Sequence, residues 1–314
     1  MLQEKGFKIV MNQTDILTYL QKQYPNNEVK LIGSGWSSDA FEVGDKIIRI
    51  PKTDVKPYEK EIAVLEFLQN KLPVQIPHPH LVKGRYPYAE HKKINGESWN
   101  IETYNKLSAT DKNLFAKDIA HFFAVLHAIP ATEILKAIPK KMIAGYTLQP
   151  VTKFHDYLKP YFSVQEIDTV YNWASKIEQI SKNPVLIHND FWKANVLVDK
   201  KHRLTGVFDW ANACLSNPEW DFKALYSPNY FPLLDKILDF YQQETGRKIS
   251  KKQIAKEKLA DCLFNVQYFG ENPKLQITMS NQWKETLMAV KKALAAIQSE
   301  NLNLNKQNIK KIER

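Results

Sequence analysis

Residues 185–199 read VLIHNDFWKANVLVD, a polar segment between two apolar runs. It opens with an apolar, strand-like run, presents His188, Asp190 and Asn195 in a polar segment, and returns to a second apolar run. Loops between strands lie at the rim of a sheet rather than in a core, and they carry many binding and catalytic residues. The pattern therefore predicts a functional loop.

A third acceptor side chain follows in the sequence. Asp209 comes directly after the apolar run at 204–208, and the turn at 200–202 predicts a hairpin that brings it to the same rim. Asp190 can accept a proton from a substrate hydroxyl, whereas Asn195 and Asp209 offer oxygen ligands to Mg²⁺. This layout suits phosphoryl transfer, in which a protein mainly positions groups and neutralises charge.

The spacing of these residues resembles that of a known family. The pattern H-x-D-x-x-x-x-N at 188–195, with FDW at 208–210 and NPEWD at 217–221, is similar to the aminoglycoside phosphotransferase and choline-kinase-like enzymes, small-molecule kinases with a protein-kinase-like fold. The resemblance implies three catalytic residues: Asp190 as the base, and Asn195 and Asp209 as the magnesium ligands.

The same resemblance implies roles for two further residues. His188 would support the catalytic loop, and Asp221 would either tie that loop down or face the acceptor. The likeness extends from about residue 28 to residue 294, and several blocks look most like the branch that phosphorylates the 2''-hydroxyl of aminoglycosides.

Near the amino terminus, the chain resembles the glycine-rich loop that covers nucleotide phosphates in this fold. Gly33 and Gly35 would begin the loop, with the hydroxyl groups of Ser34, Ser37 and Ser38 as donors. The third glycine of the kinase pattern G-x-G-x-x-G is missing, so the chain departs from the pattern here.

A second departure concerns the cation on the third strand. The kinase pattern has a lysine that binds the nucleotide phosphates and pairs with a helix glutamate, and here Arg49 aligns with it. Its partner would be Glu61, with Glu59 as the alternative, because residues two apart on a helix do not face the same way. Arginine keeps the charge and can bind phosphate through two hydrogen bonds, and Lys52 is the alternative cation.

The hydrophobic pattern predicts an α+β fold of two lobes. A helix at 12–23 precedes a β-rich block with strands in 28–51 and 81–93 and one inserted amphipathic helix at 58–68. Long helices follow at 111–127, 152–158, 163–181, 219–226, 232–244, 251–269 and 280–299. We expect a protein-kinase-like arrangement, with a small antiparallel nucleotide-binding lobe at 1–93 and a larger, mainly helical catalytic and acceptor-binding lobe at 94–314. The polar segment 300–314 is expected to be a mobile tail.

Composition narrows the class of protein. The 314 residues are 44% hydrophobic and 25% charged, which excludes a disordered chain. Cys214 and Cys262 suit a reducing compartment, and no apolar run reaches the length of a membrane span. The net charge of +10 is spread along the chain without a nucleic-acid motif. We expect a cytoplasmic monomer without membrane or nucleic-acid partners.

With the resemblance, these features predict a Mg²⁺-dependent kinase that moves the γ-phosphate of ATP or GTP to a hydroxyl of an aminoglycoside-type antibiotic, and hence antibiotic resistance. The alternatives are a kinase of a macrolide, choline-like or sugar acceptor, a nucleotide-binding pseudokinase, and a metal-dependent hydrolase with His188, Asp190 and Asp209 as ligands. The preferred nucleotide stays open, because the hinge near 90–94 recognises bases mainly through backbone groups.

Overall fold

The computed structural model describes residues 13–35, 38–52, 56–84, 86–145, 149–175 and 183–312, and only the backbone of residues 56, 57, 296 and 298–312. The amino-terminal lobe contains an antiparallel five-stranded sheet in the order β1-β2-β3-β5-β4. Its strands are β1 (Val29–Ser34), β2 (Ser38–Val43), β3 (Lys46–Pro51), β4 (His80–Val82) and β5 (Tyr88–Lys92).

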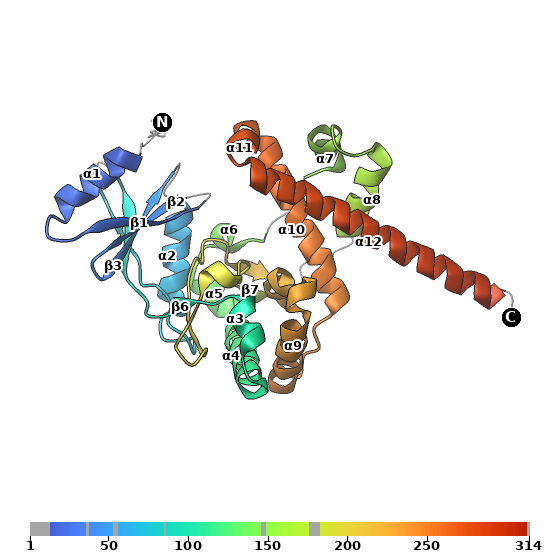
Figure 1. The fold of residues 1–314 in the computed structure, drawn as a ribbon, viewed down its shortest axis with the longest axis horizontal. Coiled ribbons are helices and arrows are strands. Elements are labelled where there is room, and N and C mark those ends of the chain that lie inside the picture. Colours follow the sequence, from blue (N-terminus) through green and yellow to red (C-terminus); the bar gives the residue numbers. More distant parts are fainter. Residues whose placement is uncertain are drawn as a thin grey trace.

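Alternation along β3 places its residues on opposite faces of this sheet. Ile48 and Ile50 are buried in a core that also contains Ile16 and Leu20 of helix α1 (Gln13–Gln23). Arg49 lies between these two isoleucines in the sequence, so its side chain emerges on the face opposite to α1. Figure 1 shows α1 at the outer side of the sheet and helix α2 (Lys56–Leu68) between the sheet and the second lobe.

Helix α2 is packed into the core of the larger lobe. Its residues Val64, Leu65 and Leu68 have no exposed surface, and they belong to the same hydrophobic cluster as Phe122 and Trp210 of that lobe. The helix therefore connects the two lobes, and it carries Glu61 to the boundary between them.

The carboxy-terminal lobe is mainly helical (Figure 1). Its α-helices are α3 (Ile101–Lys106), α4 (Ala109–Ala128), α5 (Ala131–Ala137), α6 (Lys140–Ile143), α7 (Val151–Leu158), α8 (Val164–Ser175), α9 (Phe231–Thr245), α10 (Lys251–Glu271), α11 (Pro273–Thr278) and α12 (Ser280–Ile312). The 3₁₀ helices in the described residues of this lobe are η1 (Lys193–Asn195), η2 (Pro218–Leu225) and η3 (Pro228–Tyr230).

Two small sheets lie among these helices. One has the order β6-β8-β9, with β6 (Glu97–Ser98), β8 (Val196–Val198) and β9 (Leu204–Val207), and the other pairs β7 (Val185–Ile187) with β10 (Cys214–Ser216). Along the chain, the last strand of the five-stranded sheet ends at Lys92, and the first strand of these small sheets begins at Glu97.

The structure corrects several details of the predicted elements. The apolar runs on either side of the catalytic loop, β7 and β8, belong to different sheets, because β7 pairs with β10, which the hydrophobic pattern missed. The helix expected at 219–226 is the 3₁₀ helix η2, and the short helices α3, α5, α6 and α11 were not predicted. Helix α12 continues through the expected tail as far as Ile312, and the mobility of that segment stays a prediction.

Within the described part of the chain, no single helix has both the length and the hydrophobicity needed to cross a membrane. Taken together, α4 and α5 would meet that requirement by length and composition, but they are bent by 68° at the break between them.

Candidate active site

The hairpin β8–β9 brings two of the predicted site residues to one end. Val196 pairs with Val207 in the strand register, and the N–H of Phe208 donates to the carbonyl oxygen of Asn195 at 3.0 Å. Asn195 and Asp209 therefore leave the hairpin at the same end, as the sequence pattern predicted.

Asn195 also orients Asp190. Its Nδ2 donates to the backbone oxygen of Asp190 at 2.9 Å and to Oδ2 of the Asp190 carboxylate at 3.1 Å. Asn195 is buried, at 5% exposure. Because the amide nitrogen is engaged in this way, the oxygen Oδ1 is the atom of Asn195 that can be offered to a cation.

The environment of Asp190 favours a proton on its carboxyl group. Desolvation, with further contributions from the charges of Asp209 and Asp261, raises the pKa of Asp190 to about 7, against the opposing charge of Lys223 and the hydrogen bond from Asn195. A carboxylate with a pKa near neutrality is a stronger base than an ordinary aspartate, and it is still partly ionised at pH 7.

Asp209 is held in an uncommon backbone conformation at the lobe boundary. Its φ is +64°, in the left-handed region that is rare outside glycine but tolerated by Asp and Asn. The N–H of the next residue, Trp210, donates to Oε1 of Glu61 at 3.1 Å. The turn that presents Asp209 is thus attached to helix α2.

Arg49 connects this turn to the sheet. Its Nη1 lies 2.7 and 2.8 Å from the two carboxylate oxygens of Glu61, and its Nη2 lies 3.3 Å from Oδ1 of Asp209. Burial opposes the charge, but the carboxylates of Glu61 and Asp209 outweigh it and raise the pKa of the Arg49 guanidinium. Glu61, rather than the exposed Glu59, is therefore the partner of Arg49.

The alternative cation, Lys52, serves the glycine-containing loop instead. Its Nζ donates to Oγ of Ser34 at 2.9 Å and to the carbonyl oxygen of Gly35 at 2.7 Å, and it lies 3.3 Å from Oδ1 of Asp39. The hydroxyl of Ser34 donates to the same Asp39 oxygen at 2.6 Å. Lys52 thus stabilises the turn between β1 and β2.

The remaining residues predicted for this loop are placed as follows. Gly33 is exposed at the end of β1, and the N–H of Gly35 donates to the carbonyl oxygen of Ser38 at 2.8 Å. Ser38 is buried at the start of β2. Ser37 lies outside the described residues.

Asp221 ties the catalytic loop down. It is 1% exposed, and its carboxylate accepts the N–H of His188 at 3.1 Å and the N–H of Asn189 at 2.6 Å. His127 of α4 lies 3.0 Å from the same carboxylate through Nε2. Of the two roles that the resemblance left open, this geometry fits the loop anchor.

His188 has both ring nitrogens engaged by the backbone. Nε2 lies 3.1 Å from the carbonyl oxygen of Phe208, and Nδ1 accepts the N–H of Asp190 at 3.2 Å. Desolvation lowers the pKa of the fully buried imidazole, which matches these bonds of a neutral ring. Such a ring has no nitrogen left for a metal, so the hydrolase alternative loses its histidine ligand.

Residues 28–255 match the model of the phosphotransferase enzyme family known as APH. The chain belongs to this family. The match spans most of the chain and includes the predicted site residues of both lobes. It confirms the resemblance inferred from the sequence, and with it the class of enzyme, a phosphotransferase.

Solved structures of antibiotic phosphotransferases share the fold of this family member. A GDP complex of aminoglycoside 2'-phosphotransferase-IIIa superposes with a TM-score of 0.72 at 20% identity, covering 91% of this chain and 99% of that one. A gentamicin complex of APH(2'')-IIa has a TM-score of 0.65 at 25% identity, covering 91% and 97%. Macrolide 2'-phosphotransferase type I has a TM-score of 0.62 at 20% identity, covering 91% and 98%. These likenesses confirm the predicted two-lobe, protein-kinase-like α+β fold.

A curated relative is similar over a shorter stretch. The uncharacterized protein YcbJ of Bacillus subtilis (strain 168) is 35% identical over 69 residues, which is 22% of this chain and 22% of that protein. The aligned part thus spans about a fifth of the curated relative.

Two residues of this phosphotransferase site were missed by sequence reasoning, His127 and Lys223. His127 lies in an apolar helix, and Lys223 stands in the run WDFKAL, between the buried Phe222 and the half-buried Ala224. Lys223 is 6% exposed, and its ammonium group donates to the carbonyl oxygen and to Oδ1 of Asn189. A lone lysine in a short apolar run was the available signal.

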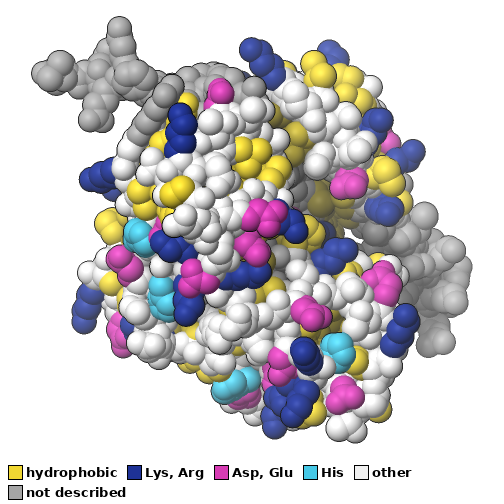
Figure 2. All heavy atoms as spheres, turned by 60° about the vertical axis from the view of Figure 1, so that its left-hand side comes forward, with side chains coloured by type: hydrophobic (Ala, Val, Ile, Leu, Met, Phe, Trp, Pro, Cys, Tyr) yellow, Lys and Arg dark blue, Asp and Glu magenta, His cyan; other side chains and the backbone are white. Residues whose placement is uncertain are grey.

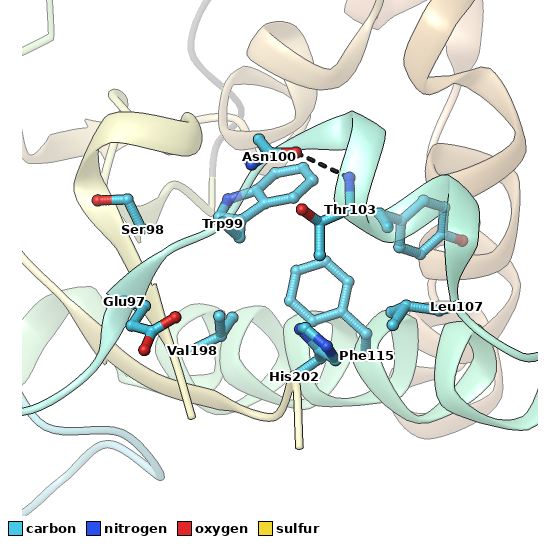
Figure 3. Close-up of a pocket in the computed structure, with 10 residues that line it drawn as sticks. Glu97, Ser98, Trp99, Asn100, Thr103, Leu107, Phe115, Val198 and His202 are labelled. Atoms are coloured by element: carbon cyan, nitrogen blue, oxygen red, sulfur yellow. Dashed lines mark hydrogen bonds between the residues drawn. The ribbon is translucent and has the colours of Figure 1, made fainter. Parts of the chain in front are cut away.

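A separate pocket of about 140 Å³ lies in the carboxy-terminal lobe (Figure 3). It is lined by residues of β6, α3, α4 and β8 with His202 of the hairpin turn, and none of the predicted site residues contributes to it. One of its polar groups is already used, because Oδ1 of Asn100 caps α3 by accepting the N–H of Thr103 at 2.7 Å.

Proposed function

We propose that this phosphotransferase transfers the γ-phosphate of ATP or GTP to a hydroxyl group of an aminoglycoside-type antibiotic. The observation that carries the proposal is the convergence of Asp190, Asn195 and Asp209 at one end of the β8–β9 hairpin, with Arg49 of the other lobe in contact with Asp209. A base, two oxygen ligands and a phosphate-binding cation are the groups that this reaction needs.

In this mechanism, Asp190 is the general base. Its Oδ2 accepts a hydrogen bond from the amide of Asn195, so Oδ1 is the oxygen that would accept the proton of the acceptor hydroxyl. As the hydroxyl oxygen forms its bond to the γ-phosphorus, the bond to the nucleoside diphosphate breaks, and the hydroxyl proton passes to Asp190. The raised pKa of Asp190 suits this transfer near neutral pH.

Asn195 and Asp209 are the residues that would hold magnesium. The fit rests on the donor set: one amide oxygen and one carboxylate at 37% side-chain exposure, both of them the hard oxygen ligands that Mg²⁺ prefers to share with phosphates. When bound, the ion would neutralise charge on the nucleotide phosphates.

The amino-terminal residues would bind the nucleotide. Arg49, oriented by Glu61, would contact the phosphates, since a guanidinium can form two parallel hydrogen bonds to a phosphate group. The loop with Gly33, Ser34, Gly35, Ser37 and Ser38 would cover them. This assigns nucleotide binding to residues 1–93, and catalysis and acceptor binding to residues 94–314.

The acceptor class is supported by charge near the base. The charges of Asp209 and Asp261 contribute, after desolvation, to the raised pKa of Asp190, which supports negative charge around the proposed base. Carboxylates attract a polycationic antibiotic, although the whole chain carries a net charge of +10. Figure 2 shows acidic and basic side chains intermixed over the face that it draws.

The test is a coupled assay of nucleoside diphosphate release, with ATP and with GTP, over a panel of aminoglycosides, macrolides, choline and sugars. We expect acceptor-dependent release with an aminoglycoside and phosphorylated product by mass spectrometry. Release with another acceptor alone would overturn the acceptor assignment. Nucleotide binding without turnover on any acceptor would identify a pseudokinase instead.

A further inference from the structure

A buried lysine lies beneath the catalytic loop of this chain. Lys223 of η2 is 6% exposed, whereas lysine is almost never buried unless it is paired. Its ammonium group donates to two oxygens of Asn189, lies 3.4 Å from Oδ1 of Asp261 and lies 5.1 Å from the ring centre of Trp220. Hydrogen-bond acceptors and an opposite charge therefore compensate the buried charge of Lys223.

Asn189 has every polar group bound. Its N–H donates to Asp221, its Nδ2 donates to the carbonyl oxygen of Asn212 at 3.3 Å, and both of its oxygens accept from Lys223. Its φ is +66°, in the left-handed region. Non-glycine residues persist there only where the surroundings hold them.

The carbonyl oxygen of Asn189 belongs to the peptide bond that joins it to Asp190. A hydrogen bond to this oxygen fixes the plane of that peptide, and the plane determines the direction in which the next side chain leaves the backbone. Lys223 therefore acts on the first backbone atoms that lead into the proposed base.

The same ammonium connects the loop with helix α10. Asp261 of α10 has a side chain that is 31% exposed, and it is near enough to Asp190 to influence that carboxyl. Since a buried charge is tolerated when an opposite charge and hydrogen bonds compensate it, Asp261 and Asn189 together stabilise the buried position of Lys223.

We propose that Lys223 is a positioning residue for phosphoryl transfer, which holds the Asn189–Asp190 peptide so that the Asp190 carboxylate faces the acceptor hydroxyl. The inference rests on the proposed function and adds a residue to it. Lys223 does not touch the reacting atoms, so its removal should reduce turnover without changing nucleotide binding.

The main variant is Lys223→Met, which keeps most of the length of the side chain and removes its charge. The matched control is Val170→Ala in α8, a buried site outside the loop whose truncation is expected to destabilise the same lobe. At a temperature well below both melting transitions, we expect kcat of Lys223→Met to fall about tenfold or more, since a small misplacement of a reacting group has effects of this size. Nucleotide KM should stay near the wild-type value, and Val170→Ala should keep wild-type kcat. Wild-type kcat in Lys223→Met would overturn the proposal.

A second pair of variants covers the case in which Lys223→Met does not fold. Asn189→Ala and Asn189→Gly both remove the side-chain acceptor of Lys223, but alanine disfavours the left-handed conformation, which glycine adopts freely. We expect kcat to be lower in Asn189→Ala than in Asn189→Gly. Equal kcat values in the two variants would show that the backbone conformation at 189 does not matter, and would overturn the proposal.

Hydrogen exchange separates this proposal from the proposed function. The Asn189 amide, which donates to Asp221, should exchange faster in Lys223→Met than in Val170→Ala, whether or not an acceptor is known. Faster exchange in a protein that turns over no acceptor would reject the proposed function, but it would support the role of Lys223 in holding the loop. Unchanged exchange would overturn the role of Lys223 itself.

Discussion

Nη2 of Arg49 lies 3.3 Å from Oδ1 of Asp209, so a cation on the amino-terminal sheet contacts a carboxylate of the other lobe. The same guanidinium holds Glu61 through Nη1. Three residues from β3, α2 and the turn after β9 thus form one charged cluster at the lobe boundary. Their coupling gives the first prediction.

Arg49→Lys should keep substantial activity, because a lysine can also reach phosphates from this strand, whereas Arg49→Ala should lose much more. Glu61→Gln should cost less than Arg49→Ala, since Glu61 acts through the arginine. The losses in kcat/KM for the nucleotide should be clearly non-additive in the Arg49→Ala, Glu61→Gln double variant. Strictly additive losses would assign phosphate binding to a different cation.

Asp209→Asn should lower Mg²⁺-dependent nucleotide affinity by about tenfold or more, because asparagine tolerates the left-handed backbone but lacks the charge that attracts the cation. Calorimetric titration with the nucleotide, with and without Mg²⁺, measures this effect. The exposed Asp235→Asn serves as the control and should bind like the wild type. Unchanged affinity in Asp209→Asn would make Asp209 a structural residue.

Asp190→Ala should lower kcat by about 10² or more and leave nucleotide affinity nearly intact, since a general base acts in the transition state. Steady-state kinetics and a separate nucleotide titration distinguish the two effects. An active Asp190→Ala variant would contradict the assignment of the base.

The pH dependence of kcat should follow the carboxyl of Asp190. Its pKa is raised to about 7, chiefly by desolvation, and the base must be ionised to accept a proton. Activity should therefore fall as the pH decreases through about 7, rather than through the ordinary range of an aspartate near 4. A rate that stays constant down to pH 5 would contradict this environment.

Glu257→Gln should stabilise the fold at neutral and higher pH. Burial raises the pKa of Glu257 to about 9, so the folded chain keeps a proton that the unfolded chain releases above its ordinary pKa. Stability is then lost as the pH rises from about 4.5 towards 9, and the Gln variant avoids this loss. The difference in melting temperature between the two proteins should be small at pH 4.5 and larger at pH 8. An equal difference at both values would show that Glu257 does not titrate in this way.

The residues that the sequence placed correctly are those whose position depends on short-range pattern. Asn195 and Asp209 flank one hairpin, so strand alternation and a turn were enough to bring them together. Arg49 and Glu61 needed the family resemblance as well, because helix spacing alone left Glu59 open.

The rest depended on contacts between segments far apart in the chain. Strand β7 pairs with β10, although the catalytic loop and the β8–β9 hairpin separate the two strands in the sequence. An apolar run of three residues does not indicate which strand it pairs with. Asp221 could be read as an anchor or as an acceptor ligand until its bonds to the loop N–H groups were seen. Lys223 was not singled out from the sequence, because its burial arises from the packing of η2 against α10.

The position of α2 determines how the two lobes can move apart. Moving the sheet and α2 away together would expose Val64, Leu65 and Leu68, each of which is fully buried against the larger lobe, at about 1.5–3 kcal/mol per side chain. Moving the sheet over a stationary α2 would leave these side chains buried, and it would separate Arg49 from Glu61 and from Asp209. The second movement exposes less apolar surface, so separation of the two lobes should break the contacts of Arg49 while α2 stays packed on the larger lobe.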